Sequence, residues 1–160
     1  MKRTHIRIIV LIFSLILVML MTGCKNKAAS EANSNTADIK NIFGIEDFEN
    51  AMKDKGYDFE ILDVDEDFLP TTRKRLVNND MAIDIYIFDS EEDAQREAGY
   101  IDDGGCTYNN GRKGVHVTWV SYPHFFKKGC LIVQYVGEDI DIVKDLGDIM
   151  GEQFAGYRWD

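Results

Sequence analysis

The pattern of apolar and polar positions divides the chain into three stretches. An apolar run covers residues 8–21 and contains one polar residue, Ser14. A short stretch of small and polar residues follows over 25–37. From about residue 38 onward, apolar and polar residues recur at the spacings of helices and strands. We therefore expect a leader, a spacer and one folded domain, the domain covering residues 39–160.

Helical spacing of apolar residues predicts three helices. In the first, Ile45, Phe48 and Met52 lie on one side, and Gly56 marks its end. In the second, Ser90 precedes three acidic residues, an order typical of a capped helix start. The third has an apolar stripe near the C-terminus. The three predicted helices cover residues 45–56, 90–101 and 138–151.

Alternation of apolar and polar residues predicts the strands. Ile83, Ile85 and Ile87 face one way in the clearest of them, and Asn110-Gly111 indicates a hairpin turn. Segment 122–129 is expected to be a connection. The expected strands are 57–64, 73–78, 81–88, 106–108, 114–121 and 130–136. This order predicts an α+β domain with a largely antiparallel sheet and helices packed on one face.

The first 23 residues have the order of a signal peptide. Lys2, Arg3 and Arg7 precede the apolar run, and Thr22-Gly23 follow it. The run is shorter than the roughly 20 apolar residues that span a bilayer. We therefore expect removal of residues 1–23.

Residues Leu20-Met21-Thr22-Gly23-Cys24 resemble the lipobox of bacterial lipoproteins. The resemblance implies cleavage before Cys24 and attachment of a diacylglycerol to its sulfur, with palmitate-type chains. Two or three acyl chains hold a protein stably on a membrane, whereas one chain holds it only marginally. An uncleaved anchor helix and an ordinary secretory signal with an incidental cysteine remain as alternatives.

Residues 24–38 are predicted to be the lipidated cysteine and a flexible linker, because their small polar side chains bury too little apolar surface to fold. A coil of about 15 residues reaches roughly 20 Å. Lys25, rather than an aspartate, follows the cysteine, which favours a Gram-positive cell. The expected location is the extracytoplasmic face of the cell membrane, through a lipid anchor.

The chain is strongly acidic. Its 18 Lys and Arg against 28 Asp and Glu give a formal charge of −10. Loss of Lys2, Arg3 and Arg7 leaves 15 against 28, or −13. Nucleic acid is therefore excluded as an expected partner, because it requires basic patches. The acidity is compatible with a cationic partner.

The chain also resembles small surface lipoproteins of low-GC Gram-positive bacteria, a family of uncharacterised function. The segments that carry this resemblance are 85–92, 118–120, 123–129 and 132–137. It implies a surface-exposed accessory protein and transfers no active-site residue.

Metal and catalytic motifs are not convincing. Asp63, Asp65 and Asp67 have calcium-loop spacing, but Phe68 replaces the required glycine and Lys74 the bidentate glutamate. A solvated acidic loop is expected there. The four zinc candidates lack short paired spacing: Cys106, His116, His124 and Cys130. We predict no catalytic residue, no metal site and no cofactor.

Cys106 and Cys130 form an even pair once Cys24 is acylated, which in an exported domain favours a disulfide. The loop-entropy relation assigns such a bridge about 3 kcal/mol. Two buried thiols that pack as small apolar groups are the alternative.

One segment has the composition of a docking surface. The predicted patch consists of Tyr122, His124, Phe125, Phe126, Lys127 and Lys128. Its alternative is that Phe125 or Phe126 folds inward. The expected function is a non-catalytic envelope interaction or accessory module with an envelope protein as partner. A small-ligand or cation binding lipoprotein, with a pocket behind the Trp119 strand, comes second, and an unrecognised enzyme third.

Overall fold

The computed structural model describes residues 42–159, so the predicted signal peptide, Cys24 and the whole predicted linker lie outside it. Three helices occur in the described chain: α2 (Ile45–Asp54), α3 (Glu91–Ala98) and α4 (Ile140–Met150). The strands are β1 (Glu60–Val64), β2 (Thr72–Val77), β3 (Ala82–Ile87), β4 (Thr107–Asn109), β5 (Gly114–His116), β6 (Pro123–Lys128), β7 (Leu131–Val136) and β8 (Ala155–Gly156).

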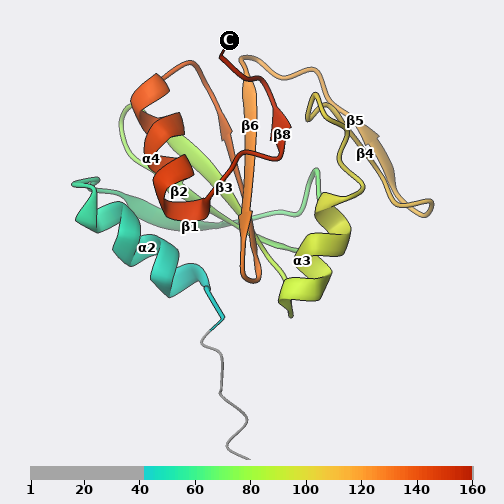
Figure 1. The fold of residues 1–160 in the computed structure, drawn as a ribbon, viewed down its shortest axis with the longest axis horizontal. Coiled ribbons are helices and arrows are strands. Elements are labelled where there is room, and N and C mark those ends of the chain that lie inside the picture. The colour runs from blue at the N-terminus through green and yellow to red at the C-terminus, as the bar shows by residue number, and fades with distance from the viewer. Residues whose placement is uncertain (1–41, 160) are drawn as a thin grey trace, which may run out of the picture. The chain divides into compact units, whose positions relative to one another are not determined.

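Six of the strands form one sheet in the order β1-β2-β3-β7-β6-β8 (Figure 1). Every pair of neighbours in this sheet is antiparallel. Strands β4 and β5 form a separate hairpin around the predicted Asn110-Gly111 turn. The predicted α+β class with a largely antiparallel sheet is confirmed.

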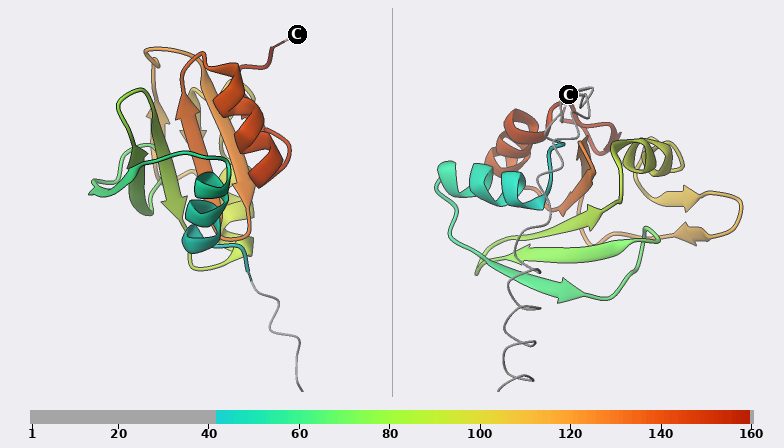
Figure 2. Two further views of the ribbon diagram at one scale, coloured as in Figure 1. Left: turned by 90° about the vertical axis from the view of Figure 1, so that its left-hand side faces the viewer. Right: turned by 90° about the horizontal axis from the view of Figure 1, so that it is seen from below.

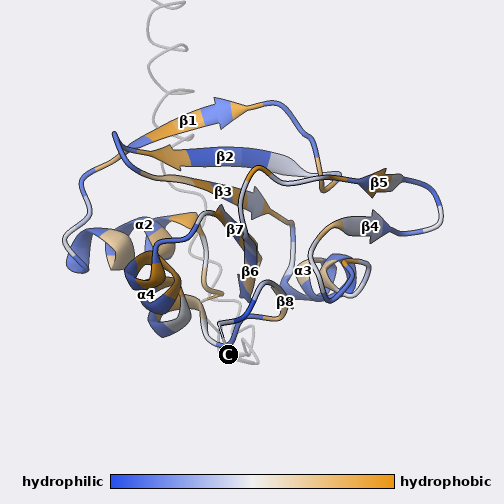
Figure 3. Cartoon of the chain, turned by 90° about the horizontal axis from the view of Figure 1, so that it is seen from above, coloured by the Kyte–Doolittle hydropathy of each residue, from blue (hydrophilic) through white to orange (hydrophobic). Residues whose placement is uncertain are grey.

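The helices cover both faces of the sheet, so the prediction of helices on one face was wrong. Helices α2 and α4 pack on the face that carries Ile83 and Ile85, whereas α3 and the β4–β5 hairpin pack on the face of Tyr86 and Phe88. Figure 3 and the right-hand view of Figure 2 show the two groups on opposite sides of β6 and β7. The reason is that β3 and β7 are apolar on both faces, and both faces must therefore be covered.

The predicted connection 122–129 is also wrong, because most of it forms the strand β6. This strand lies between β7 and β8, with Phe126 opposite Val133. Four consecutive residues, 123–126, are buried, and Pro123 takes the first position of the strand, where proline is tolerated. Gly129, with φ of +54°, then forms the tight turn into β7.

The predicted strand 114–121 ends early. After β5 the backbone leaves the hairpin, and the Trp119 indole donates to Gly105 O at 2.8 Å. The next residue, Val120, is fully exposed at 100%.

The short strand β8 joins the end of the chain to β6. Gly156 has φ of +97°, and a Cβ there would lie 2.0 Å from the carbonyl oxygen of Pro123. The described chain begins below α2 and ends beyond β8, at the opposite end of the domain (Figures 1 and 2).

We predict that Gly156→Ala destabilises the domain by about 3 kcal/mol, since it adds overpacking to backbone strain. Gly111→Ala is the matched control, because Gly111 has φ of +83° but no atom within 4 Å of the added Cβ. It should cost about 1 kcal/mol from strain alone. Urea unfolding followed by tryptophan fluorescence measures both, and equal losses would contradict the packing role of Gly156.

Candidate functional site

The predicted docking patch is not a continuous surface. Tyr122 and Lys128 are exposed and Lys127 is half-buried, whereas His124, Phe125 and Phe126 are buried. Phe126 packs towards α2 and α4, and Phe125 packs on the other face of the sheet. Both phenylalanines therefore point inward, and most of the segment serves the core.

Tyr122 instead belongs to an aromatic cluster that it forms with Tyr157 and Trp159. Its ring stacks on Tyr157 with centroids 4.0 Å apart, and Trp159 meets the two tyrosines edge-on at 5.7 and 4.9 Å. The exposed fractions of the three residues are 39%, 38% and 41%. They therefore form an ordered apolar platform that is open to solvent.

His124 forms the buried floor of the aromatic cluster. Its Nδ1 lies 3.0 Å from Gln153 Oε1, and its Nε2 lies 3.3 Å from the Gly137 carbonyl oxygen. The imidazole is nearly parallel to the Trp159 ring, with centroids 6.3 Å apart. Gln153 in turn donates from Nε2 to the Tyr157 carbonyl at 2.8 Å. The side chains of His124 and Gln153 thus hold the C-terminal tail, residues 157–159, in place.

Backbone hydrogen bonds bring the two parts of the cluster together. Tyr157 N donates to Pro123 O at 2.8 Å, and Gly137 N donates to Tyr122 O at 2.9 Å. Sequence reasoning missed Tyr157 and Trp159 because β8 has two residues and no periodic pattern. The one signal was two large aromatic residues beyond the last predicted helix.

A second group of polar side chains lies on the sheet face that α3 covers. Asp84 accepts two hydrogen bonds from Arg75, at 2.7 and 2.8 Å, and one from Arg73 at 3.3 Å. Arg73 also donates to Asp67. The Tyr86 hydroxyl donates to Asp67 at 2.8 Å, and burial, assisted by these carboxylates, strongly raises the pKa of Tyr86. The tyrosine therefore stays neutral and acts as a donor.

The acidic loop is only partly solvated, because this network uses some of it. Asp67 accepts from Arg73 and Tyr86, and Asp63 pairs with Lys74 at 2.6 Å. Asp63 nevertheless remains exposed. The loop's carboxylates thus serve the sheet and do not converge on a common point.

The four zinc candidates lie apart. His116 hydrogen-bonds with Thr107 at 3.1 Å, His124 lies under the aromatic cluster, and Cys130 follows the β6–β7 turn. In residues 42–159 there is no group of three or more side chains suited to a metal ion.

The predicted disulfide is not formed, since Cys106 and Cys130 are free thiols. Cys130 packs with the α2 and α4 core, and its Sγ lies 3.5 Å from Phe43 O. Cys106 lies in the loop on the other face, with its Sγ 3.6 Å from Gly104 O. The sheet separates the two cysteines, and both thiols are half-buried.

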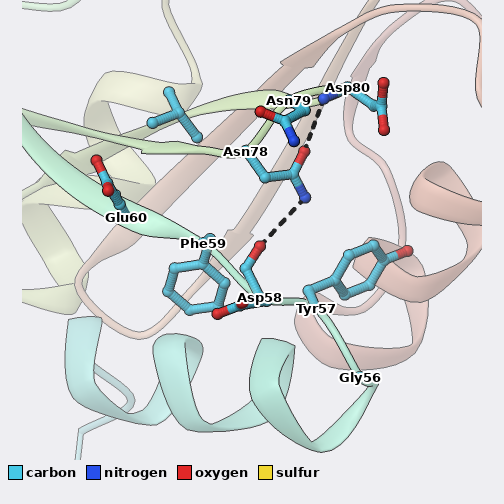
Figure 4. A pocket seen from close by; sticks show the side chains of 9 residues that line it. Gly56, Tyr57, Asp58, Phe59, Glu60, Asn78, Asn79 and Asp80 are labelled. Carbon is cyan, nitrogen blue, oxygen red and sulfur yellow. Dashed lines mark hydrogen bonds between the residues drawn. The ribbon is translucent and has the colours of Figure 1, made fainter.

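A hollow lies beside the β2–β3 turn, away from Trp119. It has a volume of about 660 Å³ and is lined by residues 56–60 and 77–80 (Figure 4). Its carboxylates belong to Asp58, Glu60 and Asp80, and no cysteine, histidine or serine lines it. The hollow therefore lacks a serine or cysteine nucleophile with a neighbouring histidine base.

Tyr57, at the rim of this hollow, is engaged elsewhere. Its hydroxyl donates to Asp145 Oδ2 at 2.9 Å, and burial together with this bond raises the pKa of Tyr57 to about 12. Lys55 pairs with the same carboxylate at 2.8 Å, which lowers the pKa of Asp145. These contacts tie the end of α2 to α4.

Comparison with protein families, curated proteins and solved structures finds no match to this chain. Among residues 42–159, no helix has the length and apolar character needed to cross a membrane.

We predict that Asp84→Ala destabilises the domain by about 2 kcal/mol or more, because Arg73 is buried and loses a charged acceptor. Asp63→Ala is the control, since its ion pair with Lys74 is exposed and should contribute less than about 0.5 kcal/mol. Thermal unfolding compares the two. Equal effects would show that the Asp84 contacts carry no more than a surface ion pair.

Proposed function

We propose that the chain is a lipid-anchored extracytoplasmic interaction module that recognises an envelope protein and catalyses no reaction. The observation that carries this proposal is the solvent-exposed aromatic cluster of Tyr122, Tyr157 and Trp159. Large aromatic side chains with a polar atom are enriched at protein interfaces and among their strongest contacts.

The rigidity of the cluster supports a role in binding. The tail that carries Tyr157 and Trp159 is held by Pro123, Gln153 and the buried His124. Side chains that are already ordered lose little conformational entropy when a partner binds. Fully exposed Val120, two residues before Tyr122, adds apolar surface beside the cluster.

The position of the cluster fits a tethered protein. The described chain starts at one end of the domain, and the aromatic tail is at the other (Figures 1 and 2). The linker from a lipidated Cys24 would join the domain at the end away from the cluster. The partner would then be a protein on the wall side of the membrane.

The ligand-binding and enzyme alternatives have weaker support. The hollow near Asp58 and Asp80 is wide open and polar, whereas small-ligand sites are mostly enclosed and apolar. Its lining has three carboxylates but no cysteine, histidine or serine.

For the anchor, we predict that the protein isolated from membranes of a Gram-positive host has a mass that begins at Cys24 and includes acyl chains. Cys24→Ala should abolish the added mass and release the protein from the membrane fraction. Intact-mass spectrometry of both proteins measures this. A full-length, unmodified mass would overturn the lipid anchor. It would not bear on the role of the aromatic cluster, which has its own test.

For the cluster, we predict that a photoreactive residue at Val120 crosslinks one discrete envelope protein in intact cells. Ile140, which is 58% exposed on α4, is the control position and should give no such product. The double variant Tyr157→Ser with Trp159→Ser should lower the Val120 product at least about tenfold, as expected when interface anchors are lost. An undiminished product would show that the cluster is not the recognition surface.

A further inference from the structure

Strand β1 forms an open edge of the sheet. Its five residues pair with β2 in continuous register, from Glu60 opposite Val77 to Val64 opposite Arg73. Within residues 42–159 no strand lies on its other side. The strand has neither a proline nor a bulge. Its outer backbone N–H and C=O groups are therefore available to a further strand.

The side chains along this edge are mainly acidic. Asp58 and Glu60 lie at its start, and Asp65 and Glu66 follow its end. Within the described chain, none of these four carboxylates forms an ion pair. Asp63 does pair with Lys74, but its side chain remains 87% exposed. The edge therefore carries exposed negative charge, and Asp63 alone among these five carboxylates is paired within the described chain.

This charge selects among the strands that could add to the edge. A second copy of the chain would bring its own acidic β1 alongside, and like charges on neighbouring strands are destabilising. A strand that carries lysine or arginine would meet the opposite charge and the same open backbone. We propose that β1 binds an extended, basic peptide segment of a partner as a seventh strand of the sheet.

The side chains of β1 define the pattern such a segment needs. Glu60 and Leu62 lie on one face of the sheet, and Asp63 lies on the other. Leu62 is 42% exposed and would contact an apolar side chain of the added strand. Basic side chains would lie beside Glu60 and Asp63. The matching strand therefore has two basic positions three residues apart, one for each face, with an apolar position opposite Leu62.

The hollow next to β1 extends this surface. Asp58 and Glu60 line it together with Asp80 of the β2–β3 turn, and two asparagine amides complete its polar wall (Figure 4). A lysine or arginine at the end of the added strand has the length and charge to enter it. The hollow and the strand edge thus favour the same occupant.

The β1 edge shares no residue with the aromatic cluster, and the inference does not rest on the proposed function. The probe is a fluorescent seven-residue peptide of sequence Thr-Lys-Val-Val-Lys-Val-Thr, titrated against the mature full-length protein in neutral detergent micelles. We expect saturable binding and slower hydrogen exchange at the β1 amides. A peptide with glutamate in place of each lysine should not bind.

Two double variants with the same change in net charge distinguish binding at the β1 edge from nonspecific electrostatic attraction. Asp58→Lys with Glu60→Lys should weaken binding at least about tenfold, and Glu92→Lys with Glu152→Lys less than about twofold. The pair Asp58→Asn with Glu60→Gln removes the two charges without reversing them. It tests the same loss of binding with less perturbation of the fold. Equal weakening by both lysine pairs, or binding without added protection of β1 amides, would overturn the proposal.

Discussion

Burial of the β6–β7 hairpin on both faces of the sheet determines where the other elements lie. Five consecutive residues of β7 and four of β6 are buried, so neither strand can leave a face in water. Helices α2 and α4 cover one face, and α3 with the β4–β5 hairpin covers the other. The outer strands β1 and β2 carry the charged side chains. These strands lie further from these helices and from the β4–β5 hairpin.

Both surfaces considered for binding follow from this arrangement. The aromatic cluster exists because β6 enters the sheet at Pro123 directly after Tyr122, and because β8 returns the tail to the same point. The His124 ring fills the space beneath the aromatic cluster, where it is buried and hydrogen-bonded. At the far side of the sheet, ion pairs of Arg73 and Arg75 with Asp84 replace apolar packing.

The sequence was informative where periodicity was strong. Phe48 and Met52 mark α2 correctly, and Asn110-Gly111 mark the β4–β5 hairpin. Prediction failed at β6, because a strand buried on both faces does not alternate and Pro123 resembles a loop signal. It also missed the side on which α3 packs, since its inner contacts are the small residues Ala94 and Ala98. Tyr157 and Trp159 could not be placed, because tertiary contacts alone join them to Tyr122. Lipidation at Cys24 lies outside the described residues and stays a prediction.

The pairing of β8 with β6 has a consequence for assembly. At this end of the sheet β8 is an edge strand of two residues, with Ala155 and Gly156 opposite Phe125 and His124. A head-to-tail fibre of sheets requires two free edges on each molecule, because every subunit must pair with one neighbour at each end of its sheet. Within residues 42–159 the β1 edge has five residues and the β8 edge only two, so β8 offers little backbone to an incoming strand. The topology therefore permits a one-to-one complex and makes open-ended polymerisation through the sheet unfavourable.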